Sequence, residues 1–417
     1  MKKEIRRSFT CLILCFFMVM SGMVFIPEAA ASSGRTQGSC GENVEWNLDT
    51  STGQLTISGE GSMDDFGDGD MAPWFDVRGQ IKSAVIGREV AGITAAAFLG
   101  CCELESFAVE EGSAAYSCEN GVLFSSDGLS LVCYPAGKTD TRYSLPEGTH
   151  RIEDMAFELC SDLEYAALPE SVTSIGRDAF ANCISLKKVN LPDSVTDADT
   201  GIFYGCDQLK TVNIGIGLAS LPEDTFRRCS GLKQVLIPDS VKEIGAGAFA
   251  ECCGLRKIIL PDSVTGIGEG AFEGCGCLTD ILYCGSQDQW QAVDRDSGND
   301  ALENAALSCD QTQPAGLYEY MYQDLSSDDW YYDWVVYTLD SNIMQGTGDN
   351  TFSPEGQLTR AEMVRILYNC REEAAGSEAA EDAASATGFS DVKSGAWYEK
   401  AVAWASSKGL VKGLSDT

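Results

Sequence analysis

Apolar positions recur in the middle of the chain at a fixed spacing of 23 residues. Every copy has a phenylalanine, a cysteine three residues later, and a leucine three residues after the cysteine. The phenylalanines are Phe157, Phe180, Phe203, Phe226, Phe249 and Phe272, and the cysteines are Cys160, Cys183, Cys206, Cys229, Cys252 and Cys275. Self-similarity at roughly 20 to 50 residues is typical of a solenoid, in which one turn of chain stacks on the next. Such a fold offers a long surface instead of a closed pocket, which favours binding over catalysis.

Within one unit, the pattern predicts a short strand and an irregular return. Val189 and Leu191 alternate with polar residues, as expected for a strand with one buried face. Pro192 ends this strand, because proline has no N–H for the ladder. The segment around Phe180 is predicted to be a helical or irregular return that places the ring in the interior. A single unit cannot bury its own apolar face, so neighbouring units must do so and the ends need caps.

Segments before and after the repeats are predicted to cap the array. Residues 44–48 and 54–58 alternate between apolar and polar positions around a short turn, which predicts a β-hairpin at the start. The segment from Trp290 to Leu307 is predicted to cap the other end. We therefore expect a mainly β fold in the first three quarters of the chain.

One earlier repeat copy is out of register with the others. Phe98 lies 59 residues before Phe157, which is 13 residues more than two periods. The extra material contains two apolar runs, residues 120–124 and 129–134, on either side of Asp127-Gly128. This is a strong hairpin signal. We expect the hairpin to form an enlarged turn that projects from the stack.

The N-terminus predicts export. Four basic residues precede an apolar run from Phe9 to Ile26, and small residues follow up to Ala31. This arrangement is typical of a secretory signal peptide cleaved after residue 31, although a retained membrane anchor is the alternative. Cleavage would leave 25 basic and 61 acidic residues, a net charge of −36. Such acidity argues against nucleic-acid binding, because a polyanion would be repelled.

The 18 cysteines raise the question of disulfides in an exported protein. Cysteines at one repeat position would stack about 4.8 Å apart and point the same way. We expect these cysteines, including Cys101, to form a buried ladder of free thiols, with bridges between turns as the alternative. Cys118 and Cys133 flank the inserted hairpin and are predicted to form a disulfide. No metal site and no cofactor are expected, and the single histidine is His150.

The pattern changes from Tyr322 onward. An apolar helical series follows Trp330, and Thr359-Arg360-Ala361-Glu362 opens a second helix. Thr359 and Glu362 have the spacing of a capping box, in which each side chain accepts a hydrogen bond from the other residue's backbone N–H. After an Ala/Glu/Ser-rich linker the pattern begins again with Trp397, and the chain stops at Thr417 before the second Thr-Arg-Ala-Glu would occur.

These motifs resemble two families. The repeat L-x-x-V-x-L-P-D-S-V-x-x-I-G-x-x-A-F-x-x-C resembles BspA-like leucine-rich repeats of bacterial surface proteins, over roughly residues 38–310. Gly215-Ile216 replaces Pro-Asp in one unit and Ala198 replaces the usual isoleucine in another, which predicts a local irregularity. The C-terminal pattern resembles S-layer homology (SLH) modules. The predicted domains are a signal peptide (1–31), a β leader or cap (32–88), the solenoid with its C-terminal cap (89–310), a linker (311–321), a small α-helical SLH module (322–383) and a second, truncated SLH module (384–417).

The resemblance implies which residues bind the cell wall. SLH modules bind secondary cell-wall polymer, often pyruvylated, and usually act in sets of three. Arg360 would meet an anionic sugar or a ketal carboxylate, with Thr359 and Glu362 beside it. Trp330 and Trp397 would offer flat faces to sugars. The alternatives are a structural salt bridge for Arg360 and a place in the module core for the tryptophans.

One column of basic residues stands out in the repeats. Lys187, Lys210, Lys233 and Arg256 hold the same position in four consecutive units. Like charges about 5 Å apart repel unless acids or a ligand lie between them. We expect either a solvated stripe compensated by Asp193, Asp239 and Asp262, or a docking strip for an acidic glycan or protein.

We therefore predict a non-enzymatic binding or adhesion protein on the surface of a Gram-positive-type bacterium. The SLH modules would hold the cell-wall polymer without a covalent bond, and the solenoid would face a protein or glycan of a host or of another bacterium. No transmembrane segment is expected once the signal peptide is removed. The alternatives are a glycan hydrolase displayed by the same anchor and a structural component of a wall lattice.

Overall fold

The structure is a computed structural model that describes residues 35–66, 70–311 and, between 325 and 411, two helices with short stretches beside them. The chain divides into two compact units, residues 1–311 and 312–417. The predicted signal peptide, the predicted linker after residue 311 and most of the segment before Thr359 lie outside the described residues.

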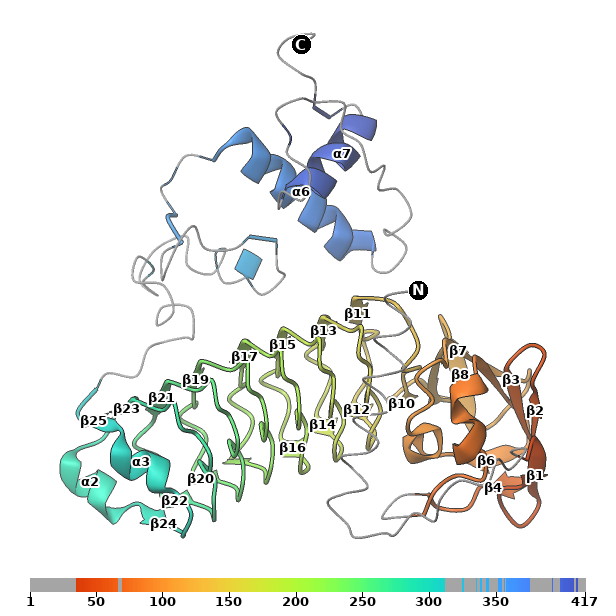
Figure 1. The fold of residues 1–417 in the computed structure, drawn as a ribbon, viewed down its shortest axis with the longest axis horizontal. Helices are drawn as coiled ribbons and strands as arrows, with labels where there is room; N and C mark the ends of the chain where they lie inside the picture. Colours follow the sequence, from red (N-terminus) through yellow and green to blue (C-terminus); the bar gives the residue numbers. More distant parts are fainter. Residues whose placement is uncertain are drawn as a thin grey trace. The chain divides into compact units, whose positions relative to one another are not determined.

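The first unit is a solenoid in which each regular turn supplies two short strands to two parallel ladders (Figure 1). The longer strands are β5 (Ser83–Ile86), β7 (Ser106–Val109), β11 (Arg142–Ser144), β13 (Tyr165–Ala167), β15 (Lys188–Asn190), β17 (Thr211–Asn213), β19 (Gln234–Leu236), β21 (Lys257–Leu260), β23 (Asp280–Tyr283) and β25 (Ala306–Ser308). The shorter strands are β4 (Gly61–Ser62), β6 (Val90–Gly92), β10 (Ser130–Cys133), β12 (Arg151–Ile152), β14 (Ser174–Ile175), β16 (Asp197–Ala198), β18 (Ser220–Leu221), β20 (Glu243–Ile244), β22 (Gly266–Ile267) and β24 (Asp294–Arg295). The predicted β-solenoid is confirmed.

The interior of the regular turns is filled by the repeated apolar positions. The six repeat phenylalanines are fully buried. Successive rings from Phe157 to Phe272 stack with centroids 4.6–5.5 Å apart. Val189 and Leu191 are also buried, as the alternation predicted. Because each ring contacts the rings above and below it, the core is continuous along the stack.

The return segment is shaped by two left-handed backbone positions in each turn, which the sequence pattern did not predict. They lie two residues before and two residues after the phenylalanine. The first set is Met155, Asp178, Gly201, Asp224, Gly247 and Gly270, and the second is Leu159, Asn182, Gly205, Arg228, Glu251 and Gly274. Positive φ is costly for most side chains, so several turns adopt this conformation with residues that do not favour it. Packing between turns therefore decides the backbone here.

The six repeat cysteines from Cys160 to Cys275 form a buried column of free thiols, which we call the thiol ladder. From Cys183 onward each S–H donates a hydrogen bond to the carbonyl oxygen of the phenylalanine one turn earlier, at 3.0–3.2 Å. Burial raises the pKa of the Cys275 thiol to about 12. The predicted ladder is confirmed for these residues, and thiols held in this state are poor nucleophiles.

The predicted disulfide between Cys118 and Cys133 is wrong: both are free thiols. Cys118 lies on β8 (Tyr116–Glu119) and Cys133 on β10, and both have Leu123 of the intervening strand β9 (Val122–Ser125) as their cross-strand partner. Two strand spacings amount to about 9–10 Å. A disulfide needs Cα atoms within about 7 Å of each other.

The inserted hairpin forms as predicted, but it does not project from the stack. Strands β9 and β10 pair antiparallel and extend the ladder of shorter strands in the order β12-β10-β9-β8. Val122 and Phe124 face the core of the regular turns, whereas Leu123 faces the core of the N-terminal part. Runs of consecutive apolar residues are typical of strands buried on both faces. The hairpin is therefore a partition between two hydrophobic cores.

Both ends are capped as predicted. At the start, β1 (Gln37–Ser39), β2 (Val44–Asp49) and β3 (Gln54–Gly59) pair antiparallel, and β3 then pairs parallel with β5. At the end, α2 (Gln287–Ala292) begins with a capping box between Ser286 and Gln289 and buries Trp290 against Tyr283. Three short helical elements complete this unit: η1 (Phe75–Gln80), η2 (Ala95–Phe98) and α3 (Asp300–Asn304).

The predicted irregularity is a double break in the sheets. The longer-strand ladder stops at β17 and resumes at β19, and the shorter-strand ladder stops at β16 and resumes at β18. Here the loop Gly215-Ile216-Gly217 lies against the preceding turn, where the Ile216 N–H donates to Asp193 Oδ1 at 3.0 Å. A side chain at Gly215 would come within 2.4 Å of the Pro192 carbonyl oxygen.

In the second unit the structure describes α6 (Arg360–Ala375) and α7 (Glu399–Ser407). They pack through Val364 and Tyr368 of α6 against Trp404 of α7, with the last two rings 5.6 Å apart. None of the helices in the described residues is long and apolar enough to cross a membrane.

Candidate functional site

The basic column follows the edge at which the longer strands begin. Backbone hydrogen bonds connect its members, from Lys210 N–H to the Lys187 carbonyl and from Arg256 N–H to the Lys233 carbonyl, at 2.9 and 2.8 Å. Lys187 is neutralised by Glu164, whose Oε2 lies 2.6 Å from its Nζ. Glu164 precedes Lys187 by 23 residues and so occupies the same column one turn earlier. The 23-residue spacing could have identified this partner from the sequence, where we expected only the aspartates.

The other three members remain open. Lys210, Lys233 and Arg256 are exposed, and none of them forms an ion pair within the described residues. We call these three residues the open basic strip. The acids expected to compensate them lie beyond the other end of each strand, six residues away, which is up to about 20 Å along an extended chain. Of the four basic residues in the column, only Lys187 is therefore compensated by an acid, and that acid is Glu164.

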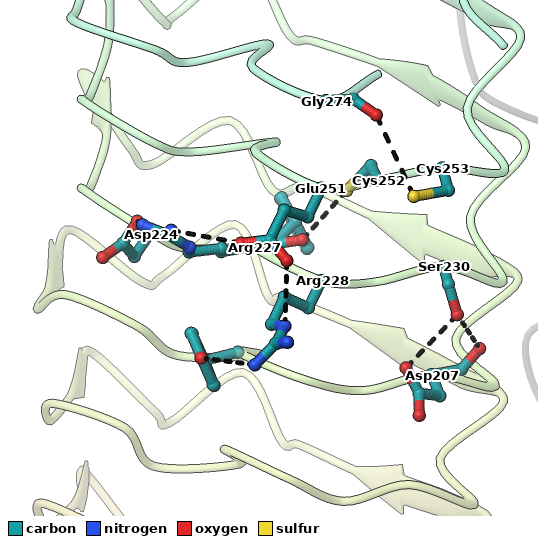
Figure 2. A network of polar contacts seen from close by, with 11 residues as sticks. Asp207, Asp224, Arg227, Arg228, Ser230, Glu251, Cys252, Cys253 and Gly274 are labelled. Carbon is teal, nitrogen blue, oxygen red and sulfur yellow. Dashed lines mark hydrogen bonds and ion pairs between the residues drawn. The ribbon is translucent and has the colours of Figure 1, made fainter. Parts of the chain in front are cut away.

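Basic residues on the return side of the turns are paired (Figure 2). Arg227 contacts Asp224 at 3.3 Å and Glu251 at 3.1 Å. Arg228 contacts the same Glu251 at 3.1 Å and the hydroxyl of Tyr204 at 3.2 Å. Basic side chains on the return side thus have acidic partners, which the strip lacks among the described residues.

An apolar ladder lies on β19 and β21, the strands that follow Lys233 and Arg256, and continues on the next strand, β23. Leu236, Ile259 and Leu282 are cross-strand neighbours on β19, β21 and β23. Leu236 and Leu282 are partly exposed. Ile259 between them is only 1% exposed, although Ile258 and Leu260 on either side of it point into the core. The strip and the two partly exposed leucines together combine positive charge with a small apolar area.

The predicted wall-binding residues are only partly described. Thr359 and Glu362 form the predicted capping box: the Thr359 N–H donates to Glu362 Oε2 at 2.6 Å, and the Glu362 N–H donates to Thr359 Oγ1 at 3.2 Å. The hydrogen bond from the Thr359 backbone lowers the pKa of Glu362. This box fixes Arg360 as the first residue of α6. The Arg360 side chain, Trp330 and Trp397 lie outside the described residues.

The single histidine and the acidic side chains bear on catalysis and metal binding. His150 is exposed, and its Nδ1 lies 2.7 Å from the Gly148 carbonyl oxygen. Among the described residues no group of three or more histidine, cysteine or acidic side chains could hold a metal ion.

Two family profiles match the chain. A profile described as "BspA type Leucine rich repeat region" matches six copies within residues 150–279. A profile described as "S-layer homology domain" matches residues 322–364 and 388–417.

Curated relatives match over short stretches. The Surface-layer 125 kDa protein of Lysinibacillus sphaericus is 37% identical over 51 residues, which is 12% of this chain and 4% of that protein. Exoglucanase XynX of Acetivibrio thermocellus is 34% identical over 89 residues, which is 21% of this chain and 7% of that protein. The chain thus spans only a small part of these relatives, and the matches to glycan hydrolases fall in the S-layer homology region.

Solved structures of leucine-rich repeat proteins are similar to the chain. One from Eubacterium ventriosum is 18% identical with a TM-score of 0.46, covering 66% of this chain and 95% of that one. The T. pallidum leucine-rich repeat protein is 29% identical with a TM-score of 0.36, covering 41% of this chain and 80% of that one.

Proposed function

Because the chain is a BspA-type leucine-rich-repeat protein with S-layer homology modules, we propose that it is an exported binding protein held on the bacterial cell wall. The modules bind secondary cell-wall polymer, and the solenoid presents an adhesive face to a protein or glycan outside the cell. The observation that supports this proposal best is the open basic strip. Three neighbouring turns each carry a cation that has no acidic partner among the described residues, in a chain of net charge −34.

The strip favours an acidic ligand. Lys233 and Arg256 precede paired strands about 4.8 Å apart, and Lys210 precedes the strand on the other side of the break. An extended polyanion or an acidic protein surface would relieve the repulsion between these cations. The partly exposed side chains of Leu236 and Leu282 add apolar area on strands β19 and β23. Such a combination is typical of protein interfaces, in which apolar contacts give affinity and charges give orientation.

For the anchor, we infer that Arg360 contacts the wall polymer. The capping box places Arg360 in the first helical turn, where the helix N-terminus adds positive potential. A guanidinium matches the planar carboxylate of a pyruvyl ketal through two parallel hydrogen bonds. Trp330 and Trp397 would give sugars a flat apolar surface.

The anchor is tested by co-sedimentation of the full chain with purified cell walls, both untreated and depyruvylated. We expect binding to untreated walls that is lost on depyruvylation and in Arg360→Ala. Lys400→Ala, which removes an exposed cation from α7, is the matched control and should bind normally. If the full chain does not bind untreated walls, the anchoring proposal is wrong.

The strip is tested by charge reversal. Lys233→Glu should weaken binding to an immobilised uronic-acid polysaccharide or polyglutamate by about 1 kcal/mol, or roughly fivefold in Kd, and the effect should shrink at high salt. Lys242→Glu reverses an exposed lysine outside the strip and is the control. Equal losses in both variants would show that only net charge matters and would contradict a defined docking strip.

A displayed glycan hydrolase and a wall-lattice component remain the two alternatives. A hydrolase would release reducing sugars from wall or host glycans, with a dependence on one carboxylate pair. A lattice component would assemble from the purified chain alone, which light scattering would detect.

A further inference from the structure

The register interruption produces a cavity in the solenoid. In the regular turns, equivalent residues stack about 4.8 Å apart and leave no room for a ligand between them. Between the first repeat copy and the regular array, however, the inserted hairpin separates the turns. On the side of the shorter strands, a cavity of about 310 Å³ opens there. Its charged lining residues are Arg151, Glu153 and Asp154.

Three separate parts of the chain build this cavity. The stretch Ile93–Ala95 belongs to the first repeat copy, and Ser125, Ser130 and Val132 belong to the partition hairpin. The charged residues lie on and directly after β12 in the first regular turn. Tyr116 ties the first two parts together, because its hydroxyl accepts a hydrogen bond from the Ile93 N–H. The cavity is therefore held between the first repeat copy and the strands of the hairpin by this hydrogen bond.

The charged side of the cavity is held in place by hydrogen bonds. Arg151 Nε donates to Glu153 Oε2 at 2.8 Å, and Arg151 Nη1 donates to Ser174 Oγ at 3.2 Å. Asp154 Oδ1 accepts from the Arg177 N–H at 3.0 Å. With two carboxylates and one guanidinium, this side carries a net negative charge, so it disfavours an anionic ligand.

The first repeat copy and the hairpin add apolar surface through Ile93, Ala95 and Val132. The cavity thus combines fixed donors and acceptors with apolar side chains. A pyranose ring has the same division, with hydroxyls around its edge and C–H groups on its faces. Each sugar hydroxyl both donates and accepts, so neighbouring hydroxyls can bond a guanidinium and a carboxylate together. The cavity volume is near the lower limit of roughly 300 Å³ for ligand sites, which suits one ring.

We propose that this cavity binds one uncharged pyranose unit of a glycan. Arg151, Glu153 and the hydroxyl of Ser130 bond the ring hydroxyls, and Ile93 and Val132 contact its C–H face. This sugar site is built from other residues than the open basic strip, so it does not rest on the proposed acidic ligand.

The test is saturation-transfer NMR on the full chain with methyl glucoside, methyl galactoside, methyl mannoside and N-acetylglucosamine. We expect saturable binding of at least one of these sugars, and weaker binding of glucuronate and of acyclic sorbitol. Binding should weaken at least tenfold in Glu153→Gln, which removes an acceptor, and in Thr94→Trp, which places an indole at the exposed edge of the cavity. Glu243→Gln changes an exposed acid elsewhere on the shorter strands and should bind like the unmodified chain.

Three results would overturn the proposal: no binding of any tested pyranoside, unchanged binding in Thr94→Trp, or tighter binding of glucuronate than of the methyl glycosides. Because Thr94 is exposed, its substitution tests the cavity even if Glu153→Gln proves unstable. Lys233→Glu separates this site from the docking strip, since it should leave pyranose binding intact. The two proposals can therefore fail independently.

Discussion

Replacing Glu158 with glutamine is expected to stabilise the solenoid at alkaline pH and to change it little at acid pH. Glu158 is packed among the turns that follow the partition, and in the described residues its Oε2 is buried without a hydrogen-bond partner. Burial, reinforced by the neighbouring charge of Asp178, raises the pKa of Glu158 from 4.5 to about 8, against the smaller opposing effects of Asn182 and Arg177. Burial also raises the pKa of Asp178 to about 6.

The direction of the effect follows from proton linkage. An acid with a raised pKa holds its proton more tightly in the folded state than in the unfolded state. Its contribution to stability is therefore complete below about pH 4.5 and is lost as the pH rises through about 8. The difference between the two pKa values corresponds to about 5 kcal/mol in total, of which about 3 kcal/mol falls between pH 5.5 and pH 8.

Urea denaturation of the full chain, followed by far-UV circular dichroism at about pH 5.5 and pH 8, measures this effect. Relative to the unmodified chain, Glu158→Gln should gain about 3 kcal/mol more at the higher pH than at the lower pH. Glu170→Gln changes an exposed acid in the next turn and is the control. Its effect on the free energy of unfolding, relative to the unmodified chain, should be equal at the two pH values. An equal change in Glu158→Gln at both pH values would refute the assignment of this buried acid.

Three further outcomes follow from the packing. Phe203→Ala should lower the free energy of unfolding by about 3–5 kcal/mol, because the ring is fully buried and stacked on both sides, and urea denaturation would detect it. Gly247→Ala should lower the melting temperature, because φ is +63° and the new Cβ would lie 2.1 Å from Asp224 Oδ1. Gly276→Ala is the control, because its Cβ would enter open space and should leave the melting temperature unchanged. The cysteines of the thiol ladder should not react with a thiol reagent such as DTNB until urea unfolds the chain, whereas the exposed Cys253 should react at once. Rapid labelling of the ladder in the folded protein would contradict its burial.

The sequence predicted the solenoid well, because the interior of a repeat fold is set by few positions that recur. The 23-residue period identified the phenylalanine stack and the thiol ladder, and the change at Gly215-Ile216 identified the break in the sheets. The inserted hairpin was assigned correctly as a hairpin but placed wrongly. Its continuous apolar runs, Val122–Phe124 and Leu131–Cys133, indicate burial on both faces, which is incompatible with a turn that projects into solvent.

Other features could not be predicted from the pattern. Leu159, Arg228 and Glu251 adopt positive φ although none of these residue types favours it, because the stacking of neighbouring turns overrides local preference. The candidate docking surface was predicted as a column of four cations, and its reduction to three depends on the pairing of Lys187 with Glu164. The cavity beside the partition could not be foreseen, since it arises from parts of the chain that meet only in three dimensions.

The double break in the sheets has a mechanical consequence. A protein tethered to a wall and gripped at its repeats would be pulled by flowing liquid, and a solenoid under tension loads its turns one after another. Between β16 and β18, and between β17 and β19, strand pairing is interrupted. The two sides are joined there by contacts on the return side, such as Phe203 N–H to the Thr225 carbonyl at 2.9 Å and the stacked rings of Phe203 and Phe226. Load that crosses this place would meet no hydrogen bonds between strands, so these two turns would separate at a lower force than turns whose strands are paired.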